Sequence, residues 1–549
     1  MVDWFLVLAI VVALLILLVV GVYLIVNYSH PEDKNEAYFP KLVTLMGFVI
    51  AGATVLLLPL DVANGEGYPG CAGYDTKFCG GLNMTLFWDI FYWLVPIWVW
   101  IMIPFSTFYY EADDGMLMAG TSVGAKPNSR LCEAIKYQIM VLIIVGLFFA
   151  LTYLFLNETA IPVMEYNGTD FAAAYQIQPY NQSNVSQFVS FSSSQLADMG
   201  PDDKKVILGT SDPFEGTEVL ATSISTFFAG LMAWLGWFFF ALFGGVGLAS
   251  MPLDLILRFV NRPRHMDAVE FAEAEMSIRE RVNELVDIGE LIKIDQDEKE
   301  NSGGKGGWFK IKSRDERQEA KEEKKTLLQF KQAVYLLEQD VEDFKNCSSN
   351  YQSYNPLIPY AALIFGVISF VVSIFWILHI ILYIIPLGLG KNPVTPFLNS
   401  YFMWFDGWFP LFGVLSVAIF TVYLMFCAVK GCFKFGLRFL FFTLHPMKVN
   451  GTYMSSFLFN TGLVLLCALP IVQFCVTAFD SYAIYATVNQ VFGTQIHYLK
   501  FFNYFWTNNV FVYMLLAFSV LTALYLGCRP RDTSADSLEL RDRLKSRRG

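Results

Sequence analysis

The chain has 549 residues, of which 55% are hydrophobic and 16% are charged, and its formal net charge is −11. Soluble domains have about 45–50% apolar and about 25% charged residues, so this composition excludes an ordinary soluble protein. Long uncharged runs instead predict an all-α, polytopic membrane helix bundle, and the acidic balance gives no basic field that would attract nucleic acid.

The first apolar run, residues 4–26, is expected to be a retained membrane span. It lacks a basic N-terminal region and is too long for the apolar core of a typical signal peptide. Asp3 precedes it, whereas Lys34 and Lys41 follow it. Because positive charge is retained on the cytosolic side, the N-terminus should face outward.

Eight further apolar runs follow, each of a length that fits one crossing of about 20 residues. They cover roughly residues 42–60, 86–108, 137–156, 226–248, 357–385, 404–429, 454–479 and 504–526. Gly244-Gly245-Val246-Gly247, at the end of the fifth run, offers small residues that would permit close helix packing. The sequence therefore predicts nine transmembrane helices, with the two termini on opposite sides.

The spans and the charges divide the sequence into four parts. Residues 1–250 hold spans one to five with a glycosylated outer loop at 157–216, and residues 356–527 hold spans six to nine. A charged stretch, 251–355, separates the two sets of spans, and a basic cytosolic tail, 528–549, follows the last span.

The distribution of Lys and Arg sets the expected orientation. The short loops on one side, together with the tail, hold sixteen Lys and Arg residues, and the short loops on the other side hold three: Lys77, Lys391 and Lys500. Cytosolic loops carry the excess of positive charge, so we expect an outer or lumenal N-terminus and a cytosolic C-terminus. A plasma membrane and an endolysosomal membrane both fit this orientation.

Sugar acceptor motifs gather on the side that the charges predict to be outer. Asn-x-Ser/Thr occurs at Asn83, Asn157, Asn167, Asn181 and Asn184. Four matches within thirty residues favour glycosylation of the loop, although chance matches in a Ser- and Asn-rich segment are the alternative.

Two of the nine cysteines differ from the rest by their surroundings. Cys71 and Cys79 lie in one short, Gly-rich polar loop on the predicted outer side, where an oxidising compartment would favour a disulfide. The other cysteines lie in or beside apolar runs or on the predicted cytosolic side and are expected to behave as small hydrophobes.

The stretch 251–355 concentrates the charge of the chain, with 39 of its 87 Asp, Glu, Lys and Arg residues. A Gly-rich hinge, 301–307, divides it into two segments, each with apolar residues at helical spacing. These apolar seams are Ile278, Val282, Leu285 and Ile292 before the hinge, and Leu327, Phe330, Val334, Leu337, Val341 and Phe344 after it. They predict a cytosolic, coiled-coil-like hairpin; the alternative is two solvated helices that never pair.

Five polar residues inside or beside the spans are candidates for an intramembrane site, because charge and polarity are costly in lipid. They are His379 in span six, Asn460 and Gln473 in span eight, Asp89 at the outer end of span three and Asp406 at the outer start of span seven. For Asp89 and Asp406 the competing interpretation is solvation at a helix end. For the other three it is a structural hydrogen bond between helices.

Two neighbouring features have structural interpretations. Asp61 follows Pro59 and is expected to cap the outer end of span two. The Trp-rich start of span three, with Trp88, Trp93, Trp98 and Trp100, is interpreted as interfacial belt and lipid-facing surface.

The motifs of common enzymes are missing from the sequence. It contains no phosphate-binding glycine loop followed by Lys and Ser or Thr, no HExxH pair, no nucleophile elbow and no Cys/His cluster with zinc-ligand spacing. With five histidines in all, metal or acid–base catalysis has little material. We therefore expect no enzyme, no metal site and no cofactor.

Short segments near the span ends carry a family resemblance. They are Val26-Asn27-Tyr28-Ser29-His30-Pro31, Ala37-Tyr38-Phe39-Pro40-Lys41, Leu58-Pro59-Leu60-Asp61-Val62-Ala63-Asn64, Ile103-Pro104-Phe105, Phe108-Tyr109-Tyr110-Glu111, Phe243-Gly244-Gly245-Val246-Gly247, His445-Pro446-Met447-Lys448, Ser456-Phe457-Leu458-Phe459-Asn460 and Gln473-Phe474-Cys475. Together they resemble the lipocalin-interacting membrane receptor (LIMR) family over nearly the full length.

The resemblance implies nine spans and a large inner loop, and it suggests more than one activity. A receptor or trafficking protein would meet a lipocalin-like protein or another ligand outside and recruit cytosolic proteins through 266–345. A transporter of a small organic solute, similar to a lysosomal cobalamin exporter, is the alternative, and a scaffold is the third. A seam exposed on the hairpin would favour a protein partner or a homodimer, whereas a buried seam would favour a spacer.

Overall fold

The computed structural model describes most of the chain in two compact units. The described residues are 3–30, 33, 37–65, 80–118, 127–165, 214–260, 268–302, single positions between 330 and 344, 357–409, 411–435, 437–439, 442–444, 447, 451–500 and 502–528. One unit comprises Met1–Met251 with Ser369–Ala523, and the other comprises Pro252–Ile368 with Leu524–Gly549. Cys71, Cys79, Asn167, Asn181 and Asn184 lie outside the described residues.

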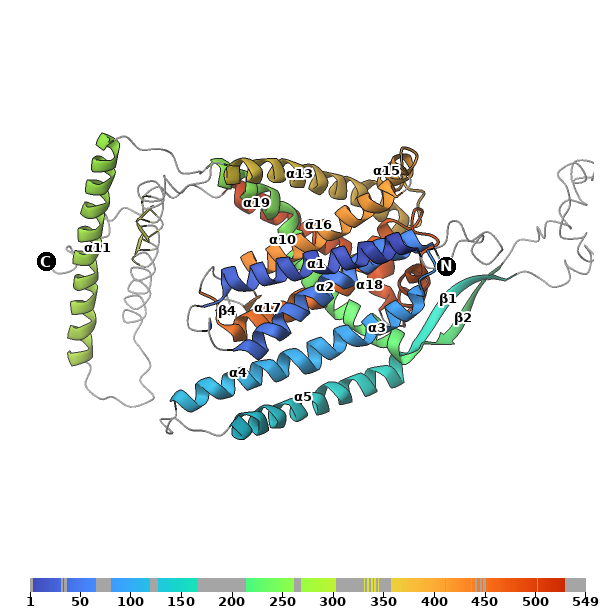
Figure 1. The fold of residues 1–549 in the computed structure, drawn as a ribbon, viewed down its shortest axis with the longest axis horizontal. Helices are drawn as coiled ribbons and strands as arrows, with labels where there is room; N and C mark the ends of the chain where they lie inside the picture. Colours follow the sequence, from blue (N-terminus) through green and yellow to red (C-terminus); the bar gives the residue numbers. More distant parts are fainter. Residues whose placement is uncertain are drawn as a thin grey trace, which may run out of the picture. The chain divides into compact units, whose positions relative to one another are not determined.

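Long helices form the described chain (Figure 1). Among these residues, nine helices are long and apolar enough to cross a membrane, which confirms the predicted fold class. The helices are α1 (Trp4–Tyr28), α2 (Tyr38–Asn64), α3 (Met84–Ile97) continued by η4 (Trp98–Met102) and α4 (Ile103–Met118), α5 (Pro127–Leu156), α10 (Ile224–Val260), α13 (Leu357–His379) continued by η6 (Ile380–Ile384) and α14 (Ile385–Gly388), α16 (Phe412–Phe435), α17 (Met454–Ala478) and α19 (Val510–Cys528).

Two of the predicted spans are broken where the sequence suggested continuous helices. A short helix, α15 (Phe397–Asp406), precedes α16, and the left-handed residue Leu411, with φ 81°, lies between them. Likewise α18 (Asn503–Thr507) is separated from α19 by Asn509, with φ 53°. A left-handed residue cannot continue an α-helix, so spans seven and nine begin at Phe412 and Val510, later than the predicted starts near 404 and 504.

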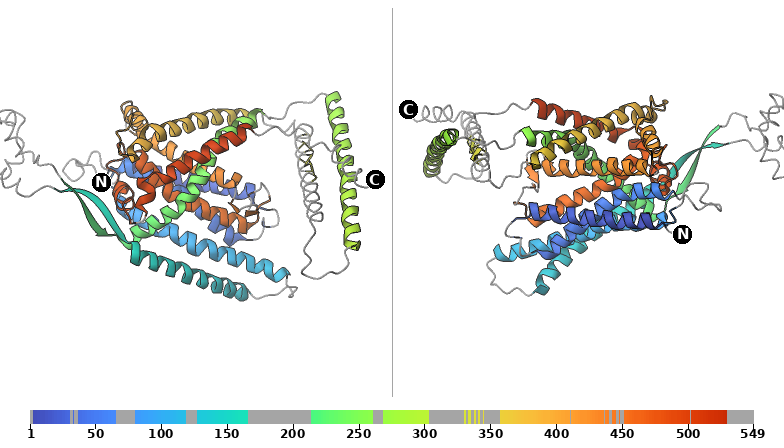
Figure 2. Two further views of the ribbon diagram at one scale, coloured as in Figure 1. Left: turned by 180° about the vertical axis from the view of Figure 1, so that it is seen from behind. Right: turned by 45° about the horizontal axis from the view of Figure 1, so that its top comes forward.

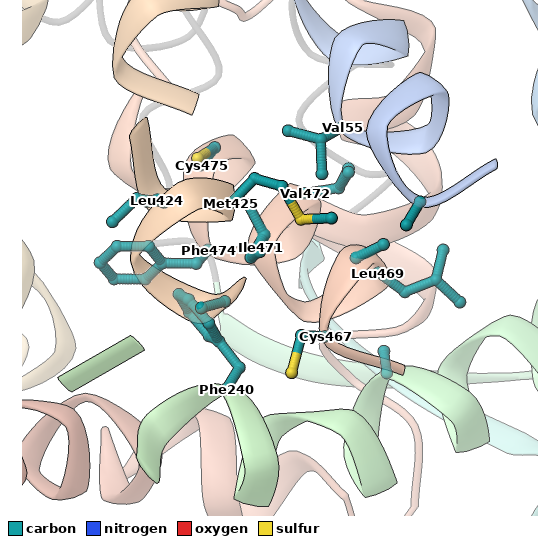
Figure 3. Close-up of a cluster of buried hydrophobic side chains, with 14 of the residues drawn as sticks. Val55, Phe240, Leu424, Met425, Cys467, Leu469, Ile471, Val472, Phe474 and Cys475 are labelled. Carbon is teal, nitrogen blue, oxygen red and sulfur yellow. The ribbon is translucent and has the colours of Figure 1, made fainter. Parts of the chain in front are cut away.

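Helix α17 is the centre of the first unit. Of its membrane-spanning window 83% is buried, compared with 72% for both α2 and α10 and 0% for α5. It packs against α2, α4 and α16. Figure 3 shows Ile471 and Val472 of α17 among side chains from α2, α10 and α16, including Val55 and Phe240. Since α5 buries none of its window in protein, we infer that lipid covers it.

Glycines on α10 let neighbouring backbones come close. A Cβ added at Gly247 would lie 1.9 Å from the carbonyl oxygen of Cys427 on α16, and one at Gly245 would lie 2.6 Å from that of Leu515 on α19. The predicted close packing is therefore confirmed at these two positions. At Gly244 the three atoms nearest to the added one all belong to Phe240 of the same helix.

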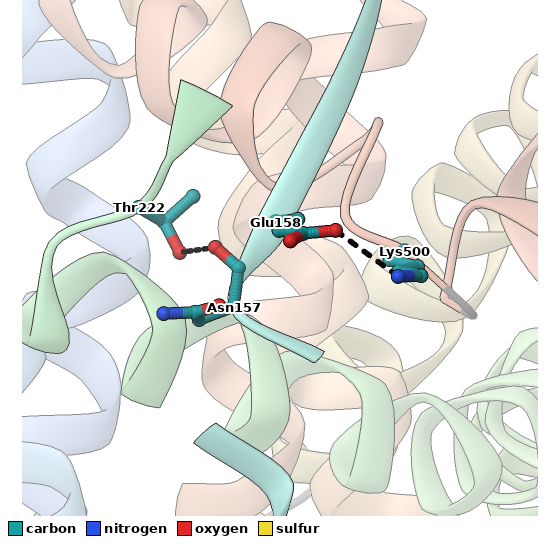
Figure 4. A network of polar contacts seen from close by, with 4 residues as sticks. All are labelled: Asn157, Glu158, Thr222 and Lys500. Carbon is teal, nitrogen blue, oxygen red and sulfur yellow. Dashed lines mark hydrogen bonds and ion pairs between the residues drawn. The ribbon is translucent and has the colours of Figure 1, made fainter. Parts of the chain in front are cut away.

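A β ribbon flanks the predicted outer loop. Strand β1 (Glu158–Glu165) pairs antiparallel with β2 (Phe214–Ala221) and extends away from the helices in both views of Figure 2. At its base, Thr222 Oγ1 donates to the carbonyl of Asn157, and Lys500 pairs with Glu158 at 3.0 Å (Figure 4). We call this part of the first unit the ribbon end.

Other contacts define which helix termini meet at each end. The Asp3 amide donates to the carbonyl of Gly80, so the start of α1 lies near the start of α3, at the ribbon end. At the opposite end, Ser29 forms a bridge with Thr452, just before α17. Two short strands, β3 (Leu437–Phe439) and β4 (Phe442–Leu444), also pair there, between α16 and α17.

The second unit contains α11 (Ala268–Ser302) and further helical positions between 330 and 344. Leu285 and Ile288 of α11 are buried with Ala333 and Leu337, and Ile278, Ile292, Phe330 and Val341 pack on this cluster. Phe271 stacks on Phe344 and Arg281 pairs with Asp340, so these contacts run antiparallel. Val282 and Val334 of the predicted seams are exposed, and Leu327 lies outside the described residues.

Replacing Gly247 by Ala should destabilise the bundle. The new methyl group would overlap the Cys427 carbonyl unless α10 and α16 separate, and overpacking of this kind costs about 1–3 kcal/mol. The midpoint of thermal unfolding of the detergent-solubilised protein should therefore fall. Gly146→Ala on α5 is the matched control, because nothing lies within 4 Å of the added atom, and it should not lower the midpoint. Equal midpoints for the two variants would contradict the packing.

Candidate functional site

A buried carboxylate fastens the ribbon end together. Asp61, in the last turn of α2, is fully buried and accepts hydrogen bonds from Trp88 Nε1 at 2.9 Å, the Val488 amide at 2.8 Å and the Thr487 amide at 3.1 Å. The sequence predicted that Asp61 would cap its own helix. Its side chain instead joins α2 to α3 and to the segment between α17 and α19.

The segment 479–509 folds over the ribbon end and contributes a π-helix, η7 (Asn489–Gln495), and α18. Tyr482 donates to Asp406 at 2.5 Å, and the Leu499 region pairs with Thr159 of β1. Phe492 and Phe502 are buried in the core. This segment is therefore an ordered part of the bundle rather than a simple connection between spans eight and nine.

A cavity of about 750 Å³ lies between this segment, α10, α17 and the end of span six. Its volume falls within the roughly 300–1,000 Å³ of small-molecule pockets. Aromatic rings and polar groups alternate on its wall, and the polar ones include Gln473, Asp480, Asn489, His497 and Asn509. We call it the main cavity.

Two residues that line the main cavity carry unused hydrogen-bond donors. Trp506 Nε1 and Asn509 Nδ2 are buried, and neither has a hydrogen-bond partner among the described residues. Both side chains are 8% exposed. Leaving a buried donor unsatisfied costs about 1–3 kcal/mol, so a ligand that presents an oxygen acceptor to these groups would gain affinity.

Two other polar groups of the main cavity have hydrogen-bond partners. Gln473 Oε1 accepts from Trp237 Nε1 at 2.8 Å, and Asp480 accepts from the hydroxyl of Tyr383. Gln473 thus joins α17 to α10 by a hydrogen bond and also lines the main cavity. It therefore fits both interpretations, a structural hydrogen bond between helices and part of an intramembrane site.

Aromatic rings form the part of the wall that faces the bundle core. Trp237 stacks on Phe511 with ring centroids 5.2 Å apart, and both line the main cavity. Phe474, also on the wall, packs on Trp376 of α13 at 5.3 Å. Spans six and eight therefore meet through apolar rings beside the cavity.

Two of the five nominated residues form structural ties away from both cavities. His379 Nε2 donates to the Ala478 carbonyl at 2.8 Å, which links α13 to α17. Asn460 donates to the Ser456 carbonyl at 2.8 Å and accepts from Cys432 Sγ at 3.4 Å. Neither lines a cavity described here, so the structure supports the competing interpretation for both.

The two nominated aspartates lie at the ribbon end in different surroundings. Asp406 ends α15 and accepts from the Gly413 amide at 2.7 Å and from Tyr482. Asp406 therefore stabilises the turn between α15 and α16 and does not lie at the start of one continuous helix. Asp89 is exposed on α3 and lines a second cavity, of about 550 Å³, that we call the side cavity. The structure does not bring the five residues into one site.

The two described sugar acceptor positions both lie at the ribbon end. Asn83 is exposed, and its side chain accepts from the Leu86 amide at 3.0 Å as the N-cap of α3. Asn157 immediately precedes β1. Glycosylation at both positions remains a prediction.

Two ionisable side chains outside the spans have altered acidity. Burial lowers the pKa of His497 below its ordinary value of 6.5. Burial, followed by the hydrogen bond to Asp406, raises the pKa of Tyr482 above 10.0. At neutral pH the His497 ring on the main cavity wall is therefore uncharged, and it stacks on Trp506 at 6.5 Å.

The nine apolar helices, their buried polar ties and the cavities at one end define a polytopic α-helical membrane protein. A family model described as LMBR1-like membrane protein matches residues 6–354 and 310–524. LIMR family proteins of Dictyostelium discoideum, Arabidopsis thaliana and Oryza sativa subsp. japonica are 32%, 31% and 31% identical to the chain. These matches cover 97%, 96% and 94% of this chain and 99%, 97% and 94% of the relatives.

The chain belongs to the LIMR family of LMBR1-like membrane proteins, as the sequence resemblance suggested. No solved structure matches it. The family assignment extends over nearly the whole chain and therefore includes the segment 479–509 and both cavities.

Sequence reasoning missed the residues that build the ribbon end. Trp88, assigned to the interfacial belt, is 2% exposed and binds Asp61, so that interpretation was wrong. Trp506 and Asn509 were absorbed into a predicted span. A usable signal was the grouping of Asn, Gln and Thr among aromatic residues between 487 and 509, which is too polar for a span.

Asp61→Asn should destabilise the ribbon end without changing side-chain volume. The amide keeps one acceptor oxygen but turns an NH₂ group toward N–H donors, and an unsatisfied buried donor costs about 1–3 kcal/mol. We expect a lower thermal unfolding midpoint and faster proteolysis within 479–509. Asp89→Asn, the same change at an exposed position of α3, is the control and should leave both unchanged. An unfolding midpoint of Asp61→Asn equal to that of wild type would contradict the stabilising role of the Asp61 hydrogen bonds.

His497 should make stability sensitive to acid. Its lowered pKa means that the unfolded chain binds the proton more readily than the folded chain. The contribution of neutral His497 to the free energy of unfolding is therefore fully present above about pH 6.5 and is lost as the pH falls. The unfolding midpoint of wild type should therefore drop on acidification more than that of His497→Gln. Thermal scans across mildly acidic pH check this, and parallel pH profiles of the two proteins would refute it.

Proposed function

We propose that the chain is a non-enzymatic membrane receptor that takes up a small organic ligand at the main cavity. The observation that carries the proposal is the pair of buried, unused donors on its wall, Trp506 Nε1 and Asn509 Nδ2. Native proteins satisfy most buried polar groups, so two such donors on residues that line one cavity favour a ligand that completes them.

The expected orientation supports binding from outside or from a lumen. The distribution of Lys and Arg predicts that the ribbon end is the outer end, and the main cavity is built from elements that meet there. The aromatic rings of the cavity would stack on flat apolar surfaces of the ligand, and the polar groups between the rings would fix the orientation of the ligand. An uptake receptor needs such a site on this side. A lipocalin-like protein at the outer loop could deliver the ligand.

Transport of a small organic solute is the second candidate, and Gln473 favours it. This amide lies on α17, the most buried span, and reaches the cavity wall. A transporter would also have to separate the rings of Phe474 and Trp376, which pack spans eight and six together. That apolar contact makes the receptor the better-supported proposal.

For the second unit we infer a spacer role rather than a homodimer. Leu285 and Ile288 are buried against Ala333 and Leu337 within one chain, so these seam residues are already covered. Cytosolic proteins would then meet the charged faces of the paired helices.

The two donors provide a direct test of the ligand site. Full-length protein in nanodiscs, isolated from its native membrane, should release a small molecule that mass spectrometry detects on denaturation. Trp506→Phe removes one N–H, and Asn509→Gly removes the other while keeping a left-handed residue. Each should reduce the amount of bound molecule about three- to tenfold, the value of one hydrogen bond.

Asn508→Ala is the matched control, because this neighbouring amide is exposed and bonds to the Tyr504 carbonyl. It should retain the molecule at the wild-type level. If wild type and the two variants release the same molecules in the same amounts, the proposed site is refuted. Sealed vesicles then separate the candidates, since a receptor saturates at one molecule per chain and a transporter fills the lumen.

A further inference from the structure

The side cavity differs from the main cavity in its chemistry. It lies between α3, the base of the β ribbon, the start of α10 and η7, and its volume is about 550 Å³. Hydroxyl and amide side chains dominate its wall, among them Thr159, Thr226, Gln490 and Thr494. Asp89 is the one charged residue among the described residues that line it.

The Asp89 carboxylate is unpaired. In the part of the chain that the structure describes, no Lys or Arg forms an ion pair with it, and no hydrogen bond to it occurs. The buried Asp61, by contrast, accepts hydrogen bonds from three donors. Asp89 therefore provides negative charge at the cavity that the described protein leaves uncompensated.

Tyr92, which also lines the side cavity, carries a second unused group. Its hydroxyl is buried and has no hydrogen-bond partner among the described residues, and Tyr92 as a whole is 2% exposed. Its ring packs against those of Trp88 and Phe492, with centroids 6.0 and 5.9 Å apart. A phenol held in this way can donate to, or accept from, a hydroxyl group of a ligand.

We propose that the side cavity binds a small, hydroxyl-bearing organic cation, with Asp89 opposite its ammonium group and the Tyr92 hydroxyl and neighbouring Thr and Gln side chains on its hydroxyls. The volume is far larger than a metal ion needs, and the described residues contain no cluster of three His, Cys, Asp or Glu that could hold one. The walls come from the first turns of α3, the ribbon base, the start of α10 and 487–495, all at the ribbon end, so the proposed ligand would enter from that end.

Matched sugars test this on the full-length protein in nanodiscs of phosphatidylglycerol, a lipid without an ammonium group. Glucosamine at mildly acidic pH carries an ammonium where glucose carries a hydroxyl, and N-acetylglucosamine is neutral. We expect saturable binding of radiolabelled glucosamine and at least tenfold weaker binding of the two neutral sugars, since a hydrogen bond to a charged group is worth about tenfold or more in affinity.

Two variants and one control assign the effect to the cavity. Asp89→Asn should weaken glucosamine binding about tenfold and abolish its advantage over glucose. Tyr92→Phe should weaken it several-fold without lowering the unfolding midpoint, because the buried hydroxyl has no described partner to lose. Glu218→Gln removes the same charge from an exposed position on β2 that does not line the cavity and should have no effect.

Equal affinity for glucosamine and glucose, absence of binding by all three sugars, or full glucosamine affinity in Asp89→Asn would each overturn the proposal. Binding in the main cavity does not enter this test, because neither Asp89 nor Tyr92 lines it.

Discussion

The ribbon end depends on the burial of one carboxylate. Taking Asp61 out of water costs several kcal/mol unless donors replace the solvent, and three N–H groups from two other segments do so. Two of them are consecutive amides, those of Thr487 and Val488, directly before η7. A negative charge at the start of a helical segment also stabilises it. The position of 479–509, and with it the wall of the main cavity, follows from this interaction.

The opposite end of α2 is fixed in a similar way. Asp33, just before α2, is 6% exposed and accepts from the Tyr110 hydroxyl at 2.8 Å and from the Met454 amide at 3.1 Å, at the start of α17. One aspartate beside each end of α2 thus caps a different helical segment. Between them, apolar packing of α2 on α17 supplies most of the burial. Asp33 and Asp61 determine which segments lie beside the ends of α2, and the apolar core stabilises that arrangement.

The spans could be predicted from the sequence because lipid imposes a simple rule: about 20 apolar residues make one crossing. The partner of a polar residue follows no such rule. Asp61 was expected to cap its own helix and Asp406 to be solvated, yet their partners come from Thr487, Val488 and Tyr482, far along the chain. Gln473 was nominated for its depth in span eight, and only its hydrogen bond to Trp237 shows which face of α17 it occupies. Long-range pairing, not local pattern, determines the site.

The two cavities share one wall. In η7, Asn489 and Gly493 face the main cavity, whereas Gln490 and Thr494 face the side cavity. A π-helix has a poorer fit of hydrogen bonds than an α-helix and is frequent at functional sites. Here the wider turn lets one short segment present polar side chains in two directions while Asp61 holds its start. Because η7 contributes to both walls, the hydrogen bonds that hold its start on Asp61 help to fix the shape of both cavities.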